Sequence, residues 1–179
     1  MAKASLSRES LLPLVAAYVM QHGLAGMSLR PLAKAAGTSD RMLIYHFGSK
    51  DALVADLLAF LAQNFTASLD AAFPQGRAAS RRDCALTVMD ITGREDFQPF
   101  FRIWWDIVAG CQRGDPAYLA AAGDIMDQLT RWVANHLPED DPDPDSGAKL
   151  VITAIEGAQM LAAIGRRGVG LAGISQLPQ

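Results

Sequence analysis

The sequence predicts an all-α protein, and three observations support this fold class. Apolar residues recur with the helical period along most of the 179 residues, and no stretch shows the strict alternation of a half-buried strand. Serine, threonine and aspartate residues precede these periodic segments and glycines follow several of them, as is typical of helix starts and ends. Half of the residues are hydrophobic, so we expect a folded core rather than disorder.

The first part of the chain should hold four helices. The first covers about 8–22 and can begin after Ser7 or after Ser10. A start after Ser10 keeps Pro13 in the first turn, whereas a start after Ser7 places this proline where it should kink the helix. The next three are expected over Leu29–Ala36, over about Asp40–Phe47, and from the Ser49 cap to about Ala72. At ~1.5 Å per residue, the fourth helix is long enough to bridge two modules.

The second part should continue as helices separated by loops. A loop covers 73–80, and an acidic, proline-rich loop covers PEDDPDPDSG, from position 138 to 147. Between and after these loops we expect helices over about 81–93, about 95–112, Pro116–Leu137 and about 146–165. The glycine-rich end should form a loose tail or a short helix.

Charge is distributed unevenly. The net charge is −3, but residues 1–50 carry six lysines and arginines against two acids, while the remainder is acidic. A basic N-terminal module on an acidic body suggests an anionic partner for that module, although chance segregation of charge remains the alternative. The start MAKASLSRES lacks an apolar signal-peptide core, and the apolar segment LVITAIEGAQMLAAIG is too short and polar to span a bilayer. Two cysteines without a C-x-x-C motif suit a reducing compartment. We therefore expect a cytoplasmic protein with no membrane partner.

One short segment concentrates hydrogen-bonding and cationic side chains. AAGTSDRMLIYHFGSKDAL runs from Ala35 to Leu53 and joins two short helices through about three residues. Gly37 permits the tight turn, and the second helix would project its first residues into a DNA major groove, as in a helix-turn-helix. The alternative is a helical connector with a solvated polar face.

The candidate DNA contacts differ in what they can bind. The guanidinium of Arg41 can reach guanine O6 and N7, and Lys50 can meet a phosphate at the start of the fourth helix. Phosphates or base edges can also be bound by Thr38, Ser39, Tyr45 and His46. The candidate contacts are Ser28, Thr38, Ser39, Asp40, Arg41, Met42, Tyr45, His46 and Lys50.

Residues 7–60 resemble the N-terminal domain of the TetR family of bacterial transcriptional regulators. The segment HGLAGMSLRPLAKAAGTSDRMLIYHFGSKDAL follows the family pattern at Gly23, Ser28, Leu32, Ala33, Ala36, Gly37, Ser39, Leu43, Tyr45, His46, Phe47, Ser49, Lys50 and Leu53. The resemblance implies a helix-turn-helix DNA-binding domain over 1–48 and an effector-binding and dimerisation domain over 49–179. It implies a ligand-responsive regulator, which we expect to be a homodimeric repressor released from a palindromic double-stranded operator by a small, mainly apolar effector.

Two positions depart from the family pattern. The family usually has an aromatic residue where this chain has Ile44, which implies one phosphate contact fewer. Asp40 replaces a commonly basic or polar residue. An acid suits the start of a helix and repels phosphate, but it can accept from cytosine N4. We therefore expect an operator that differs from the family average.

The last long helix is apolar on two faces and should be covered on two sides. In a small all-α protein, another subunit would cover the second apolar face. The alternative is that this helix lies at the centre of a monomer. The candidate dimer contacts are Leu129, Trp132, Val133, Leu150, Ala154, Ala158 and Leu161.

Aromatic residues cluster in the predicted sixth helix and can line an apolar ligand cavity, although ordinary core packing is the better explanation for any single ring. The candidate effector-pocket residues are Phe97, Phe101, Trp104 and Trp105.

No catalytic residues, cofactor motif or metal site can be assembled from the sequence. The three histidines are scattered, and GVGLAG follows no strand that could build a dinucleotide-binding fold. We therefore expect no enzyme activity. The two rival hypotheses are an enzyme that begins with three similar helices and a DNA-binding protein that responds to no effector.

Overall fold

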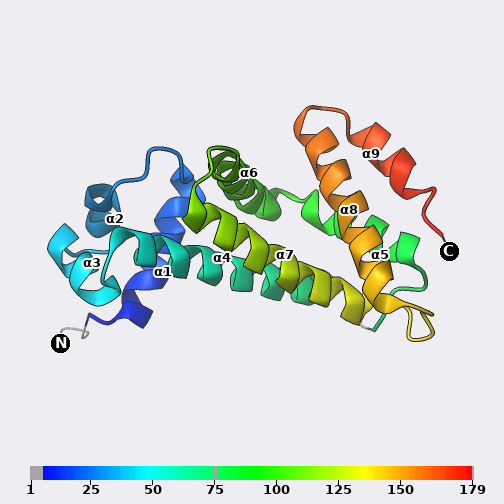
Figure 1. Ribbon diagram of the computed structural model, residues 1–179, viewed down its shortest axis with the longest axis horizontal. Helices are drawn as coiled ribbons and strands as arrows, with labels where there is room; N and C mark the ends of the chain where they lie inside the picture. Colours follow the sequence, from blue (N-terminus) through cyan, green and yellow to red (C-terminus); the bar gives the residue numbers. More distant parts are fainter. Residues whose placement is uncertain (1–5, 75, 179) are drawn as a thin grey trace. The chain divides into compact units, whose positions relative to one another are not determined.

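The computed structural model describes residues 6–74 and 76–178, and within these residues all regular structure is helical (Figure 1). The predicted all-α fold class is therefore confirmed. The α-helices are α1 (Arg8–His22), α2 (Leu29–Ala35), α3 (Asp40–Phe47), α4 (Lys50–Ala72), α5 (Arg81–Thr92), α6 (Gln98–Gln112), α7 (Pro116–His136), α8 (Pro144–Ala163) and α9 (Arg167–Ile174). A short 3₁₀ helix, η1 (Glu95–Phe97), precedes α6.

Local capping decides where several helices begin. Ser7, rather than Ser10, caps α1, because the two serines form a capping box in which each hydroxyl accepts from the other's backbone N–H. Pro13 therefore lies inside the helix. At α8 the Asp143 carboxylate accepts from the Ser146 N–H at 3.1 Å, and Pro144 takes the first helical position. The helix thus starts two residues before the predicted position 146.

The chain divides into two compact units. Unit 1 takes in the chain as far as Phe65 together with Pro99–Ile125, and unit 2 takes in Thr66–Gln98 and Met126–Gln179. The division between these units does not fall after position 48. The functional boundary expected there therefore stays a prediction. The buried core of unit 1 draws on α1, α2, α3, α4 and α6 through Leu11, Val15, Val19, Leu32, Leu43, Phe47, Leu53, Leu57, Leu58, Leu61, Ile103 and Ile107.

Helix α4 is, by length and composition alone, apolar enough to cross a membrane. A core helix of a globular protein passes the same test. Four of its leucines, Leu53, Leu57, Leu58 and Leu61, lie in the core of unit 1. Packing inside the protein thus accounts for its apolar composition.

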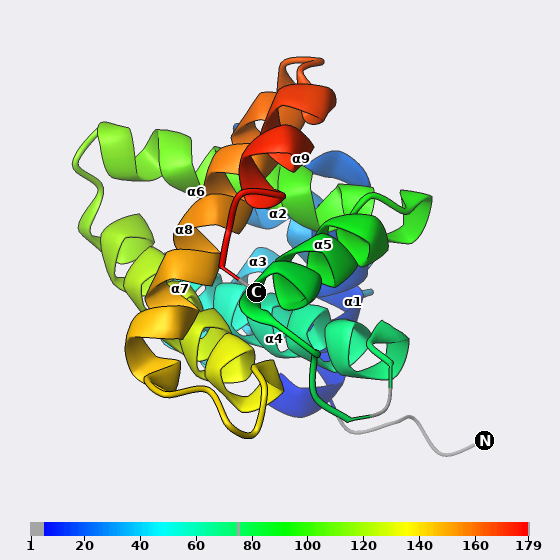
Figure 2. The same cartoon turned by 90° about the vertical axis from the view of Figure 1, so that its right-hand side faces the viewer.

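In unit 2, helix α8 lies against both α5 and α9 (Figures 1 and 2). The contact with α9 is close, because a Cβ built on Gly170 would lie 2.8 Å from Cα of Ala158. A side chain longer than hydrogen at position 170 would therefore push the two helices apart. The buried amide of Gln159 donates to the Thr92 hydroxyl at 2.6 Å and joins α8 to α5.

An ion pair holds the loop before α8 to the start of α5. The Arg81 guanidinium donates to both carboxylate oxygens of Asp141, at 2.8 and 2.6 Å, and to the Asp143 carbonyl at 2.9 Å. The bond from Arg81 holds the pKa of Asp141 below its ordinary value. The acidic loop predicted from the sequence is thus anchored by a bidentate contact that the sequence pattern did not reveal.

Candidate nucleic-acid interface

Helices α2 and α3 form the predicted helix-turn-helix. Gly37 in the turn has φ of +66°, a conformation that a residue with a Cβ rarely adopts. The Thr38 N–H donates to the Ala33 carbonyl at 2.9 Å and closes the turn. Ala33 and Leu43 are fully buried in one core, so the two helices are held from behind by apolar packing. Helix α3 is thereby fixed while its other face stays open to solvent.

The open face of α3 carries most of the candidate DNA contacts. Arg41 and Asp40 are exposed in its first turn, and 77% of Tyr45 is accessible. Among the described residues, the side chain of Arg41 forms no hydrogen bond or ion pair. Arg41 can therefore meet a ligand without first breaking a hydrogen bond or ion pair within the described part of the chain.

The other candidates are more constrained. The Ser39 hydroxyl caps α3 by accepting from the Met42 N–H at 3.3 Å. Thr38 and Met42 are half-buried. Ser28 precedes α2 and is exposed, and its side chain makes no capping bond, so its hydroxyl is available to a partner.

Lys50 begins α4, and the neighbouring cap is satisfied because the Ser49 hydroxyl accepts from the Ala52 N–H at 3.0 Å. The ammonium group of Lys50 is exposed beside this helix start. A cation and a helix N-terminus together favour an anion.

His46 is less accessible than its neighbour in α3. Its Nε2 is buried and has no hydrogen-bond partner within the described part of the chain. The Tyr45 ring meets the His46 ring edge-on, with the centroids 5.2 Å apart. A direct contact from His46 to DNA would need its buried ring nitrogen to become exposed.

Arg8 is a supporting residue that the sequence analysis missed. Its guanidinium pairs with the Asp56 carboxylate of α4 and lies over the Phe47 ring, 5.7 Å from the centroid. It therefore links α1 to the end of α3 and to α4. A single arginine at the start of a helix carries no sequence signal for such a role.

The four candidate effector-pocket residues do not share one unit. Phe97 is buried and belongs to unit 2, whereas Phe101, Trp104 and Trp105 are half-buried and belong to unit 1. In unit 1 the Phe65 ring meets Phe101 edge-on, with the centroids 6.1 Å apart. The α6 rings therefore contribute to ordinary aromatic packing.

The candidate dimer contacts also separate into two sets. Trp132, Val133 and Ala158 are buried within the chain, so they offer no surface to a partner, and this part of the prediction is corrected. Ala158 in particular is covered by α9 of the same chain. Leu150 is exposed, and Leu129, Ala154 and Leu161 are half-buried.

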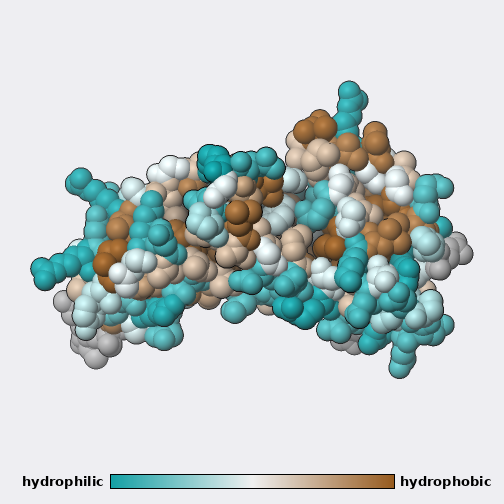
Figure 3. Space-filling model, viewed as in Figure 1, coloured by the Kyte–Doolittle hydropathy of each residue, from teal (hydrophilic) through white to brown (hydrophobic). Residues whose placement is uncertain are grey.

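The outward face of α8 forms an apolar stripe, with positions spaced alternately by four and three residues. We call it the α8 stripe, and it consists of Leu150, Ala154, Gly157, Leu161 and Ile164. Figure 3 shows hydrophobic atoms gathered over α8 and α9, where Ile164 is 65% and Val169 60% exposed. This surface is large and apolar for a side of a protein that faces water.

Among the described residues, no group of three histidine, cysteine, aspartate or glutamate side chains is placed to hold a metal ion.

Residues 16–57 match the family model described as bacterial regulatory proteins, tetR family. The chain carries the DNA-binding domain of the TetR family of bacterial transcriptional regulators. The matched segment runs from the middle of α1 into α4 and includes the whole helix-turn-helix.

Several solved structures share the fold of this chain. A protein described as a transcriptional regulator, SCO7518 of Streptomyces coelicolor A3(2), is 23% identical, with 94% of this chain and 96% of that chain covered and a TM-score of 0.72. A protein of Streptomyces avermitilis MA-4680, described as a TetR transcriptional regulator, is 28% identical over 89% of this chain and 87% of its own, with a TM-score of 0.56.

The multidrug binding protein EbrR, complexed with imidazole, is 17% identical over 96% of this chain and 90% of its own, with a TM-score of 0.69. No curated protein matches the chain.

Proposed function

We propose that this TetR-family regulator is a cytoplasmic repressor that binds a palindromic operator as a homodimer and leaves it when a small, mainly apolar effector binds. The exposed polar face of α3 carries the proposal, because an apolar-backed short helix with an unpaired arginine in its first turn suits major-groove reading. The assignment to a family of DNA-binding regulators supports it.

In the proposed complex, the part of the DNA that each side chain contacts depends on its position in or near α3. Arg41 and Asp40, in the first turn, read base edges, with Arg41 on guanine and Asp40 on the cytosine amine. Tyr45 and the serine hydroxyls of Ser28 and Ser39 bind phosphates or base edges. Lys50 binds a phosphate, and this contact sets the register without reading sequence.

The α8 stripe supplies the proposed dimer surface. The inner face of α8 is already covered by α5 and α9, while the stripe residues are exposed or half-buried in the single chain. A second copy of α8 could pack there, because the small residues Ala154 and Gly157 would allow two helices to approach closely. Two recognition helices related by a two-fold axis would then match a palindromic operator.

We expect the protein to sediment at about twice its chain mass of 19.2 kDa at micromolar concentration. Leu150→Glu should shift it to the monomer mass, because two copies of the charge would face each other in a desolvated interface. Leu119→Glu is the matched control, since Leu119 is also an exposed leucine on a helix but lies outside the α8 stripe. A folded, monomeric parent protein would exclude the proposed dimer.

An effector should weaken operator binding, and operator DNA should weaken effector binding by the same factor. The α6 rings Phe101, Trp104 and Trp105 are the proposed apolar contacts, and the imidazole complex of EbrR is consistent with small-molecule binding in this fold. Compounds that stabilise the protein in a thermal-shift screen should then lower its affinity for operator DNA by about 5- to 150-fold in fluorescence anisotropy. Stabilising compounds that leave operator affinity unchanged would favour the constitutive DNA-binding alternative.

A further inference from the structure

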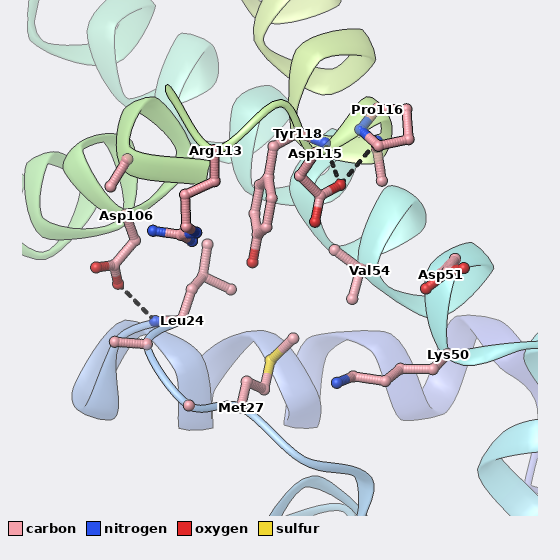
Figure 4. Close-up of a pocket in the computed structure, with 14 residues that line it drawn as sticks. Leu24, Met27, Lys50, Asp51, Val54, Asp106, Arg113, Asp115, Pro116 and Tyr118 are labelled. Carbon is pink, nitrogen blue, oxygen red and sulfur yellow. Dashed lines mark hydrogen bonds between the residues drawn. The ribbon is translucent and has the colours of Figure 1, made fainter. Parts of the chain in front are cut away.

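A cavity of about 540 Å³ lies entirely within unit 1 (Figure 4). It is bounded by the loop that follows α1, the start of α4, the end of α6 and the start of α7. Its volume falls in the range of cavities that bind small molecules. It involves none of the aromatic residues assigned to the effector above. It is therefore a separate candidate site.

Three acids line this cavity, and each has a favourable environment within the chain. The Asp106 carboxylate accepts from the Leu24 N–H at 2.8 Å. The Asp115 carboxylate accepts from the N–H groups of Ala117 and Tyr118 at the start of α7, at 3.0 and 3.4 Å. Asp51 is exposed in the first turn of α4, where the helix favours a negative charge.

Two cations line the same cavity without a partner. Among the described residues, the side chains of Lys50 and Arg113 form no ion pair or hydrogen bond. Figure 4 shows the Lys50 side chain extending along one side of the cavity towards Met27, while Arg113 enters from α6. Two of the three acids already accept hydrogen bonds within the chain, whereas neither cation has a partner, so Lys50 and Arg113 leave the cavity with unused hydrogen-bond donors.

The rest of the lining adds a hydroxyl donor and an apolar wall. Tyr118 directs its hydroxyl into the space between Arg113 and the start of α4 (Figure 4). Burial, and then the charges of Asp115 and Asp106, raise the pKa of Tyr118, so its phenol stays protonated at neutral pH. We call the side chains of Leu24, Met27 and Val54 the apolar wall of the cavity.

We propose that this cavity binds a small organic carboxylate, with its anionic group held by Arg113, Lys50 and the Tyr118 hydroxyl and its apolar body against the apolar wall. A carboxylate can accept from a guanidinium through two parallel bonds, and a charge-assisted bond is about twice as strong as a neutral one. The site also has a regulatory consequence, which rests on the proposed function. Lys50 is the proposed phosphate contact, so one ammonium group would serve either the ligand or the operator.

The test uses three compounds of the same shape that differ in charge. These are 2-naphthoate, the neutral 2-naphthamide and 2-naphthylmethylammonium, each titrated into the full-length protein without DNA and followed by calorimetry. We expect 2-naphthoate to bind once per chain, the amide to bind more weakly and the ammonium compound not to bind. Arg113→Gln should weaken 2-naphthoate by about 10- to 100-fold, because a hydrogen bond to a charged group is lost.

Arg131→Gln is the matched control, because Arg131 is an exposed arginine of α7 outside the cavity. Tyr118→Phe keeps the ring and should weaken 2-naphthoate by a smaller factor than Arg113→Gln. Equal binding of naphthoate and naphthamide, preferential binding of the ammonium compound, binding of none of the three at millimolar concentration, or an unchanged affinity in Arg113→Gln would each overturn the proposal.

A second measurement separates this site from the DNA-binding proposal. Saturating 2-naphthoate should weaken operator binding by the wild-type protein and leave that of Lys50→Gln unchanged, because the shared cation is absent. If 2-naphthoate binds through Arg113 but operator affinity does not change, the binding site stands and the regulatory consequence is wrong. If the protein binds no operator at all, the titration without DNA still decides whether the carboxylate site exists.

Discussion

Replacing Arg41 with alanine should weaken binding to the cognate operator by roughly 1–3 kcal/mol and affect binding to random DNA much less. Arg41 lies in the first turn of α3, exposed and without a side-chain partner among the described residues. In a helix-turn-helix this turn faces base edges, where a guanidinium can bind guanine through two bonds. The substitution should therefore reduce recognition of the operator sequence more than general affinity for DNA.

Lys50→Ala is the informative comparison, because both substitutions remove one positive charge. Lys50 begins α4, past the end of the recognition helix, where an ammonium group can meet a phosphate but not a base. Its loss should weaken operator and random DNA by similar factors. It should also lower the slope of log affinity against log salt by about one for each site engaged.

The measurement is a salt titration of both variants on the operator and on a scrambled duplex. The parent protein and Arg131→Gln serve as references, since Arg131 is an exposed arginine far along the chain from the helix-turn-helix. If Arg41→Ala loses equal affinity on both duplexes, Arg41 is a phosphate contact. The bases would then be read by Asp40, Ser39 or Tyr45 instead.

Gly110→Ala should destabilise the protein by about 1–3 kcal/mol, because the added methyl group has no room. A Cβ built on Gly110 in α6 would lie 2.4 Å from Cδ2 and 2.6 Å from Cγ of Tyr118. These ring atoms lie close to the backbone of α7, so the ring cannot move aside without shifting the helix. The substitution should also weaken 2-naphthoate, because Tyr118 lines the proposed carboxylate site.

Gly123→Ala is the control, with an expected effect of the opposite sign. Gly123 is also inside a helix, and a Cβ there would meet nothing within 4 Å. Alanine in an exposed helix interior is favoured over glycine by about 1 kcal/mol. Urea denaturation of the two variants measures both effects. An unchanged midpoint for Gly110→Ala would mean that α6 and α7 are free to separate at this point.

Interactions between residues close together in the sequence made most of the fold predictable from the sequence. Gly37, Ser39 and Ser49 act on the backbone within a few residues, so the turn and the starts of α3 and α4 follow from local sequence. The exposed cationic and hydroxyl side chains of α3 were predictable for the same reason. A helix of eight residues backed by Leu43 and Phe47 has its opposite face open.

The sequence by itself determined the all-α class, the helix-turn-helix and the resemblance of its N-terminal domain to the TetR family. Only the tertiary structure decided which apolar residues of α8 are covered, because the periodicity of one helix does not say which neighbour packs against each face. Ala158 thus lies under α9, while Leu150, the residue next to the buried Val151, remains exposed. The cavity lined by Lys50 and Arg113 could not be predicted from the sequence either. Its walls come from three separate segments, 24–27, 50–54 and 106–118. The packing of these segments, rather than any local pattern, leaves two cations without partners among the described residues.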